Sequence, residues 1–266
     1  MARRIRLDTE LVRRGLARSR EQAADLIAAG RVVVAGQTAG KAASQVGQDA
    51  AIVVDRSERG AEYASRGGRK LEGALAAFPD LVVAGRRCLD AGASTGGFTD
   101  VLLRAGAAQV VAVDVGYGQL AWALRTDPRV TVLDRVNVRQ LTPEQVAPAP
   151  GLVAADLSFI SLVLVLPALV ACAAADADFL LLVKPQFEVG KGGVGSGGVV
   201  RDPAQREAAV AGVAAAAWQA GLGARGIVAS PLPGPSGNVE YFLWLRRAAS
   251  PLDQAALRRA ITEGPQ

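Results

Sequence analysis

Short apolar segments alternate with longer, helix-length segments over most of the chain. Five of these apolar runs have the length of a β-strand, and successive runs begin roughly 20 to 27 residues apart. They cover residues 87–90, 110–114, 130–133, 152–156 and 179–183. This spacing leaves room for a crossover helix between successive strands, which a parallel sheet requires. The pattern therefore predicts an α/β fold with a doubly wound parallel sheet, whose ligands bind beyond the carboxyl ends of the strands.

A later apolar run, residues 239–245, is expected to add a last strand to this sheet. Residues 157–175 form an uncharged stretch of 19 residues, long enough to suggest a membrane span. The stretch contains Ser158 and Pro167, however, and it is followed closely by the apolar strand at 179–183. We therefore interpret it as a strand end followed by a buried helix.

The first 35 residues are predicted to form two short helices and a strand. The second helix has Ser19 as its N-cap, Gln22 three residues later as in a capping box, and Gly30 at its end. Short strands are expected at residues 31–34 and 51–54.

A polar run at residues 55–60 marks the boundary between this small α+β module and a larger domain. Half of the 266 residues are hydrophobic, which is enough for two separate cores. The predicted organisation is a module over residues 1–60, a linker over 61–64 and the larger domain over 65–266.

Histidine is absent from the sequence, which excludes serine–histidine triads and histidine metal sites. The two cysteines, Cys88 and Cys172, lie in apolar runs and have no zinc-like spacing. Proton transfer must therefore depend on lysine, acidic, tyrosine or cysteine side chains. We expect no metal, and we expect a reducing, cytoplasmic location because the start of the chain lacks the apolar core of a secretory signal.

The positive charge is concentrated at the front of the chain. Residues 1–70 hold 14 Lys and Arg against 8 Asp and Glu, a net charge of +6, whereas the whole chain has a net charge of +5. This asymmetry points to a polyanionic partner: RNA, DNA or an anionic membrane surface.

A glycine-rich loop, residues 89–99, follows the first strand of the larger domain and leads into a helix expected to begin near Thr99. Its glycines allow the backbone to approach a ligand closely. The letters do not match the G-x-G-x-x-G pattern of dinucleotide sites. Asp90 at the strand tip suits a cofactor that carries an ammonium and a sulfonium, and Asp114 is placed to accept from ribose hydroxyls. S-adenosylmethionine is therefore the expected cofactor.

The residues expected to bind this cofactor share the carboxyl ends of the first strands and the glycine-rich loop. They are Asp90, Gly92, Ser94, Gly96, Gly97, Phe98, Thr99, Asp114, Asp134 and Asp156.

Charged residues stand beside apolar strands at the same predicted edge. Asp156 and Lys184 end parallel strands, and Glu240 reaches the edge if the last strand runs antiparallel. A partly desolvated lysine near a second cation, for which Lys70 is the candidate, can act as a general base. Lys184 would then take the proton from a hydroxyl, while Asp156 and Glu240 orient the two lysines. Residues 156–159 read Asp-Leu-Ser-Phe rather than the Asn/Asp-Pro-Pro-aromatic pattern of amino-group methyltransferases, so we expect an oxygen acceptor.

Seven segments of the chain resemble known families. The front module is similar to S4-type RNA-binding domains, and the six later motifs are similar to the TlyA (haemolysin A) family. The segments are Arg6–Val34, Ala64–Leu71, Leu89–Thr99, Asp114–Leu120, Asp156–Ser161, Lys184–Glu188 and Pro233–Glu240.

This resemblance covers nearly the whole chain and implies a seven-stranded Rossmann-like methyltransferase domain of the FtsJ type. It implies methylation of the ribose 2′-oxygen of cytidine in ribosomal RNA, with a catalytic tetrad at Lys70, Asp156, Lys184 and Glu240. An arginine-rich first helix over residues 2–6 resembles the longer members, which modify both ribosomal subunits and create sites for capreomycin-class antibiotics. We expect a monomer that does not bind membranes. In the linker, Tyr63 stands where relatives are expected to have tryptophan.

Several basic residues are expected to contact RNA phosphates. They are Arg3, Arg4, Arg6, Arg14, Arg18, Arg20, Arg31, Lys41, Arg66 and Lys191. Lys191 belongs to a glycine-rich segment, residues 189–198, interpreted as a loop over the bound nucleotide or as a plain connection.

Two other functions remain as alternatives. A membrane-active haemolysin would use the basic front end on lipid, but it would leave the cofactor loop and the tetrad without a role. A non-catalytic RNA-binding regulator is disfavoured by the intact tetrad.

Overall fold

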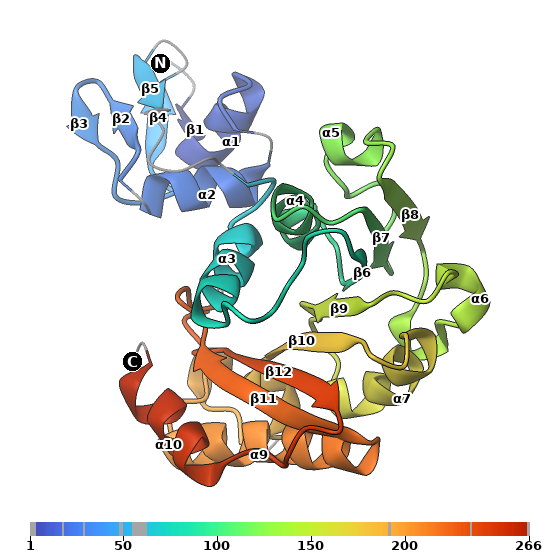
Figure 1. Cartoon of the computed structure of the whole chain (residues 1–266). Helices are drawn as coiled ribbons and strands as arrows, with labels where there is room; N and C mark the ends of the chain where they lie inside the picture. The colour runs from blue at the N-terminus through green and yellow to red at the C-terminus, as the bar shows by residue number, and fades with distance from the viewer. Residues whose placement is uncertain are drawn as a thin grey trace. The chain divides into compact units, whose positions relative to one another are not determined.

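The computed structural model describes residues 4–17, 19–28, 30–47, 50–54, 63–190, 193–234 and 236–264. The chain divides into two compact units, Met1–Glu62 and Tyr63–Gln266 (Figure 1). The predicted linker over residues 61–64 spans this division: residues 61 and 62 lie outside the described residues, whereas Tyr63 and Ala64 belong to the second unit.

In the described part of the first unit, two helices and five short strands enclose a small core. The helices are α1 (Leu7–Arg13) and α2 (Arg20–Ala28). The strands are β1 (Arg4–Arg6), β2 (Val32–Val34), β3 (Gln37–Thr38), β4 (Gln45–Gly47) and β5 (Ile52–Val54). Leu7, Leu11 and Ile27 are among the buried residues. Ser19 Oγ accepts a hydrogen bond from Gln22 N at 3.1 Å, which confirms Ser19 as the start of the second helix.

The expected arginine-rich helix over residues 2–6 is wrong. Arg4–Arg6 form strand β1, which pairs antiparallel with β4 so that Ile5 lies opposite Val46. Residues 2 and 3 lie outside the described part of the chain. The strand pairing satisfies the backbone of Arg4–Arg6, so the first helix begins only at Leu7.

The second unit is built on the seven-stranded sheet that the sequence predicts. Its strand order is β11-β12-β10-β9-β6-β7-β8, with β12 antiparallel to both neighbours and the remaining pairs parallel. The strands are β6 (Arg87–Ala91), β7 (Gln109–Asp114), β8 (Val130–Asp134), β9 (Leu152–Ala155), β10 (Asp178–Val183), β11 (Leu222–Ala229) and β12 (Tyr241–Arg247). Every strand predicted in this unit is found within two residues of its expected ends.

Helices cover both faces of the sheet, as a doubly wound fold requires. One face packs against α3 (Gly67–Ala77), α4 (Gly97–Arg104) and α5 (Trp122–Arg125). The other packs against α6 (Pro143–Val146), α7 (Leu162–Cys172), α9 (Pro203–Gln219) and α10 (Gln254–Glu263). Short turns η1 (Val138–Gln140), α8 (Pro185–Glu188) and η2 (Ser196–Gly198) complete the chain. Helix α4 begins at Gly97, two residues before Thr99, near which its start was predicted.

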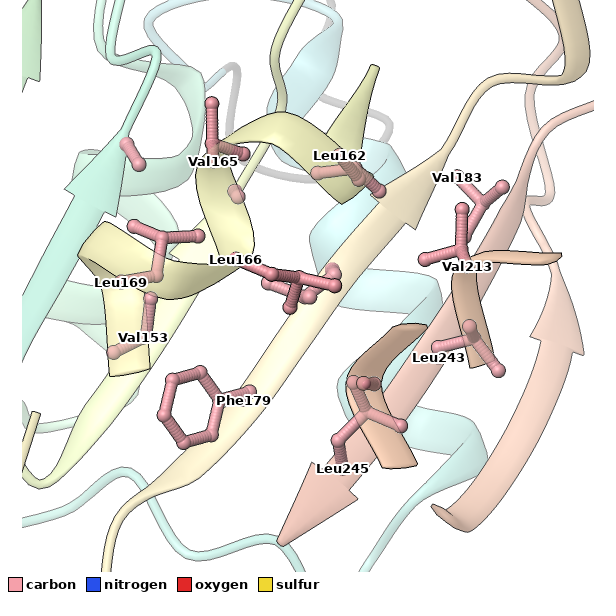
Figure 2. Packing of buried hydrophobic residues seen from close by; sticks show 14 of the residues in the cluster. Val153, Leu162, Val165, Leu166, Leu169, Phe179, Val183, Val213, Leu243 and Leu245 are labelled. Atoms are coloured by element: carbon pink, nitrogen blue, oxygen red, sulfur yellow. The ribbon is translucent and has the colours of Figure 1, made fainter. Parts of the chain in front are cut away.

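Helix α7 accounts for the uncharged stretch at 157–175. Its residues Leu162, Val165, Leu166 and Leu169 are buried against β9 and β10 (Figure 2). The interpretation as a buried helix is therefore confirmed. Within the described ranges, no helix has the length and apolar character needed to cross a membrane.

Strand β11 is absent from the sequence prediction because glycine and arginine interrupt its apolar pattern. A β-bulge lies between Ala224 and Gly226. A Cβ atom at Gly226 would lie 2.7 Å from the Phe78 ring, so glycine at this position makes room for an aromatic side chain of the core.

Candidate active site

The carboxyl ends of β6, β9 and β10 meet at one edge of the sheet. Ala155, the last residue of β9, pairs with Ala91 of β6 and with Leu181 of β10. Val183, which ends β10, pairs with Tyr241, which begins the antiparallel strand β12. Asp156, Lys184 and Glu240 each adjoin one of these strand ends, so the sheet register brings them to the same edge.

Lys184 and Asp156 form an ion pair at this edge. The Nζ atom of Lys184 lies 2.6 Å from Oδ1 of Asp156, and the lysine is largely buried. The same Nζ donates a hydrogen bond to Ser158 Oγ at 2.9 Å. Two side chains from one loop thus fix the position of the lysine amine.

Lys70 and Glu240 form a second, more deeply buried pair. Lys70 Nζ donates to Glu240 Oε2 at 2.6 Å, and both side chains are shielded from solvent. The other carboxylate oxygen, Glu240 Oε1, is buried and has no hydrogen-bond partner in the described part of the chain. It lies against Gly234, where a Cβ atom would come within 2.5 Å of it.

The four residues of the predicted tetrad are therefore brought together as two lysine–carboxylate pairs. Lys70 reaches the edge because the turn before α3 packs directly on the glycine-rich loop. A Cβ atom at Gly97 would lie 2.3 Å from Ser65 Oγ and 2.8 Å from Gly68 N. The close approach of these two segments places the first turn of α3, and with it Lys70, above the sheet.

The glycine-rich loop is also closely packed against the segment that carries Asp156. Gly92 has φ +90°, and a Cβ atom there would lie 2.5 Å from the backbone oxygen of Asp156. Gly96 has φ +100°, and its Cβ atom would meet Leu124 at 2.3 Å. Glycine at these positions permits both the left-handed backbone and the close contact.

Asp90 is a fully buried carboxylate at the end of β6. Thr99 Oγ1 donates to its Oδ2 at 2.6 Å, and its Oδ1 is buried without a partner among the described residues. Burial raises the pKa of Asp90 to about 7, assisted by the negative charge of Asp156. A cationic ligand with N–H donors would satisfy Oδ1 and stabilise the charged carboxylate. The ammonium group of S-adenosylmethionine has this chemistry.

Other predicted cofactor residues occupy the ends of β7 and β8. Asp114 accepts from Ser94 N at 2.8 Å and from Gly116 N at 2.7 Å, so its carboxylate shapes the loop. Asp134 forms an ion pair with Arg125, whose hydrogen bond lowers the pKa of Asp134. Phe98 is buried, and its ring stacks on that of Phe242 in the core, with the two ring centroids 6.0 Å apart.

Sequence reasoning missed three residues near Lys184. Ser158 contacts the lysine directly. Phe159 has φ +62° and is 91% exposed, and its ring centroid lies 5.2 Å from that of Phe187. Glu188 accepts from Ser161 Oγ at 2.6 Å and from Leu162 N at 2.8 Å, which joins α8 to the start of α7. The sequence signal for these residues was their position two to four residues after Asp156 or Lys184, inside segments that carry the family resemblance.

The predicted RNA-binding residues fall into three groups. Arg4 and Lys41 are exposed, and Arg31 is half-buried. Others are held by protein groups: Arg6 and Arg20 contact Asp8, Arg14 contacts Glu10 and the Ala50 carbonyl, and Arg66 donates to the Pro233 carbonyl. Arg3, Arg18 and Lys191 lie outside the described residues.

Comparisons with known proteins agree with this architecture. The FtsJ-like methyltransferase family matches residues 63–247, and the S4 domain matches residues 5–52. The chain is 63% identical to the 16S/23S rRNA (cytidine-2′-O)-methyltransferase TlyA of Mycobacterium tuberculosis strain H37Rv over 100% of both chains. It is 42% identical to the candidate rRNA methyltransferase YqxC of Bacillus subtilis, covering 92% of this chain and 86% of the relative.

A solved structure described as a candidate hemolysin from Streptococcus thermophilus is also similar to this chain. Its TM-score is 0.78 at 36% identity, covering 99% of this chain and 96% of the other. Both domains, the seven-stranded sheet and the full-length identity lead to the same assignment. The chain therefore belongs to the FtsJ-like methyltransferase family and, within it, to the TlyA proteins.

Proposed function

We propose that this methyltransferase transfers a methyl group from S-adenosylmethionine to the ribose 2′-oxygen of cytidine in ribosomal RNA. The observation that most supports this function is the pair formed by Lys184 and Asp156 at the edge of the sheet, beside a glycine-rich loop. That loop carries the buried Asp90 Oδ1, which has no hydrogen-bond partner among the described residues. The relative from Mycobacterium tuberculosis is named for this reaction on 16S and 23S rRNA. We extend the same two targets to this chain and, as the family resemblance implies, we propose a link to capreomycin sensitivity.

The cofactor residues are proposed to hold S-adenosylmethionine along the ends of β6 and β7. Asp90 would accept from its ammonium group through Oδ1, and Asp114 would accept from its ribose hydroxyls while keeping its bonds to the loop backbone. Gly92 and Gly96 let the loop backbone approach the ligand. When bound, the cofactor supplies an electrophilic methyl group.

Lys184 is proposed as the general base. A ribose hydroxyl is a weak nucleophile, so its proton must leave as its oxygen attacks the methyl carbon. The neutral amine of Lys184 would accept that proton, and Asp156, 2.6 Å away, would stabilise the ammonium that forms. Glu240 would hold Lys70 in place beside the acceptor. Correct alignment of the reacting groups is worth roughly 7 to 11 kcal/mol.

The basic front unit is proposed to bind rRNA through phosphates, as a monomer acting on ribosomal subunits in the cytoplasm. Transfer of labelled methyl groups to purified subunits that lack the modification tests the function. Label on a cytidine 2′-oxygen in each subunit is the expected result. Cofactor binding without label on either subunit would contradict the proposal.

A further inference from the structure

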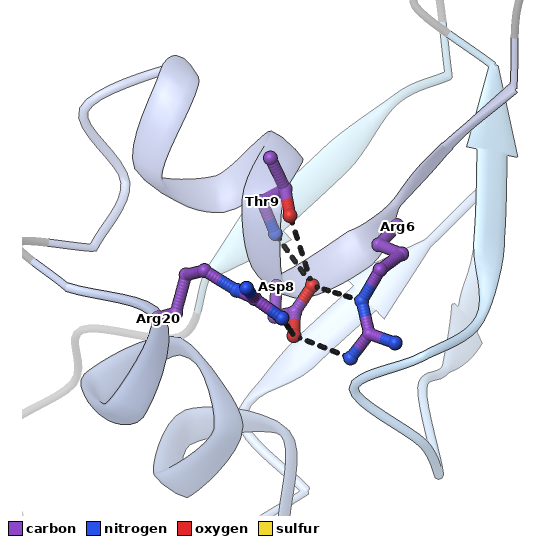
Figure 3. A network of polar contacts seen from close by, with 4 residues as sticks. All are labelled: Arg6, Asp8, Thr9 and Arg20. Atoms are coloured by element: carbon purple, nitrogen blue, oxygen red, sulfur yellow. Dashed lines mark hydrogen bonds and ion pairs between the residues drawn. The ribbon is translucent and has the colours of Figure 1, made fainter.

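One carboxylate in the first unit holds two arginines that come from different segments. Asp8, in the first turn of α1, is only 4% exposed. Its carboxylate accepts from Arg6 Nε at 3.0 Å, Arg6 Nη2 at 2.7 Å and Arg20 Nη2 at 3.1 Å (Figure 3). Thr9 also donates to it, through its backbone N at 2.8 Å and its hydroxyl at 3.2 Å. The Arg6 guanidinium holds the pKa of Asp8 well below its usual range, so the carboxylate stays ionised.

The two arginines remain accessible although they are anchored. Their side chains are 45% exposed for Arg6 and 61% exposed for Arg20. The contacts with Asp8 use two N–H groups of Arg6 and one of Arg20. A guanidinium has five such donors, so, within the described part of the first unit, most of the donors of Arg6 and Arg20 are left for a further acceptor. Together, the side chains of Asp8, Arg6 and Arg20 carry a net charge of +1.

The neighbouring carboxylate Glu10 makes a different arrangement. It pairs with Arg13 and Arg14, which follow it on the same helix by three and four residues. Arg14 is only 22% exposed and also donates to the Ala50 carbonyl at 2.7 Å. This second cluster therefore braces α1, whereas Asp8 ties the end of β1 to the start of α2.

We propose that Asp8 is a positioning residue for RNA binding. It fixes Arg6 and Arg20 side by side, with their free N–H groups outward, as a preformed receptor for the phosphodiester backbone. Arginine suits this ligand because its planar guanidinium can donate two parallel hydrogen bonds to a phosphate. Fixing both side chains before binding removes much of the entropy that would otherwise be lost. The inference rests on the proposed function, in which the first unit binds rRNA.

A positioning role for Asp8 and a purely electrostatic role predict opposite changes in RNA affinity when the charge of Asp8 is removed. Asp8→Asn removes a negative charge near the RNA, which by long-range attraction alone would tighten binding. If Asp8 positions the arginines, the same change weakens binding. Glu21→Gln is the matched control, because Glu21 is exposed, adjoins Arg20 and gives the same change in net charge.

The test measures binding of the full-length protein to purified ribosomal subunits over a range of salt concentrations. We expect Asp8→Asn to weaken binding about tenfold and to reduce the salt dependence by about one phosphate contact. Glu21→Gln should bind as tightly as wild type or slightly more tightly. In methyl-transfer assays, Asp8→Asn should raise KM for subunits and leave kcat unchanged. Equal or tighter binding by Asp8→Asn would overturn the proposal.

A second variant decides the question if Asp8→Asn fails to fold. Arg6→Lys keeps the charge and leaves Asp8 in place, but it cannot make the two-pronged contact with both carboxylate oxygens. Because Arg6→Lys would also lose a two-pronged contact with a phosphate, weaker binding supports Arg6 as a phosphate contact, and wild-type affinity contradicts the proposal. If wild type itself does not bind subunits, the proposed function fails together with this inference. If wild type binds and methylates but the variants are unaffected, only the inference fails.

Discussion

Lys70 and Glu240 are separated by 170 positions in the chain, yet the Nζ and Oε2 atoms of the two side chains lie 2.6 Å apart in a buried ion pair. Lys70 comes from α3 and Glu240 directly precedes β12. The pair therefore links the helix that packs on the glycine-rich loop to β12, the strand that borders β10. This contact couples the position of the glycine-rich loop to the sheet edge that carries Asp156 and Lys184.

Breaking this pair should affect both stability and activity. Glu240→Ala leaves a buried ammonium without a partner, so we expect the free energy of unfolding to fall by about 3 to 5 kcal/mol. The double variant Lys70→Met with Glu240→Met leaves no unpaired charge and should recover most of that loss, whereas methyl transfer should be abolished in both proteins. Urea unfolding and single-turnover transfer measure the two effects. Normal transfer by the double variant would contradict the assigned role of the pair.

Gly92 should be required for cofactor binding for a reason beyond its backbone conformation. Gly92→Ala introduces a Cβ atom 2.5 Å from the Asp156 carbonyl, which forces the loop away from the acceptor edge. We expect cofactor affinity to fall more than about tenfold. Gly118→Ala is the matched control, because Gly118 also has positive φ, +65°, but no atom within 4 Å of the new Cβ. It should cost about 1 kcal/mol of stability through backbone strain alone. Calorimetric titration with the cofactor distinguishes the two variants.

The raised pKa of Asp90 predicts that cofactor binding depends on pH. The carboxyl is protonated in the free protein below about pH 7 and charged above it. An ammonium ligand favours the charged form, so affinity should rise as pH increases from 6 to 8, with release of a proton on binding below pH 7. Affinities measured by titration calorimetry in two buffers of different ionisation enthalpy check both statements. A flat pH profile for wild type would contradict them.

The raised pKa of Asp90 also makes stability depend on pH, but stability should fall as pH rises, whereas cofactor affinity should increase. Because the folded protein holds this proton more tightly than the unfolded chain, Asp90 lowers stability as pH rises from about 4 to about 7. Asp90→Asn should therefore raise the free energy of unfolding at pH 8, on the order of 2 kcal/mol, and remove the pH dependence of cofactor binding. Thermal unfolding of the two proteins without cofactor at pH 8 measures this gain. A less stable Asp90→Asn protein would show that the charged form is not disfavoured by burial.

The parallel strands could be predicted because each buried strand is a continuous apolar run between helix-length segments. Edge strand β11 could not be predicted, because Arg225 lies in a β-bulge and Gly226 makes room for Phe78 of another element. Neither requirement is visible in the local sequence. The arginines at 4–6 resembled a basic helix, but strand pairing with residues 45–47 decided their conformation. Such pairing between distant segments leaves little local signal in the sequence.

The candidate site was predictable in its residues but not in its pairing. Asp156, Lys184 and Glu240 stand out as charges beside apolar strands, Lys70 was the candidate second cation, and the family resemblance implies all four. Which lysine pairs with which carboxylate depends on the sheet register and on the packing of α3. Ser158 and Glu188 carry no signal of their own, because their contacts arise only when two loops are brought together.

In the proposed reaction, Lys184 removes the proton from a ribose 2′-hydroxyl. Single-turnover methyl transfer to unmodified ribosomal subunits, measured across pH for wild type and Lys184→Ala with cofactor affinity determined in parallel, tests it most directly. We predict a wild-type rate that increases with pH, and a Lys184→Ala protein that binds cofactor and subunits normally but transfers at least about a hundredfold more slowly at every pH. Transfer by Lys184→Ala at a rate within a few fold of wild type, with label still on cytidine 2′-oxygen, would contradict the account.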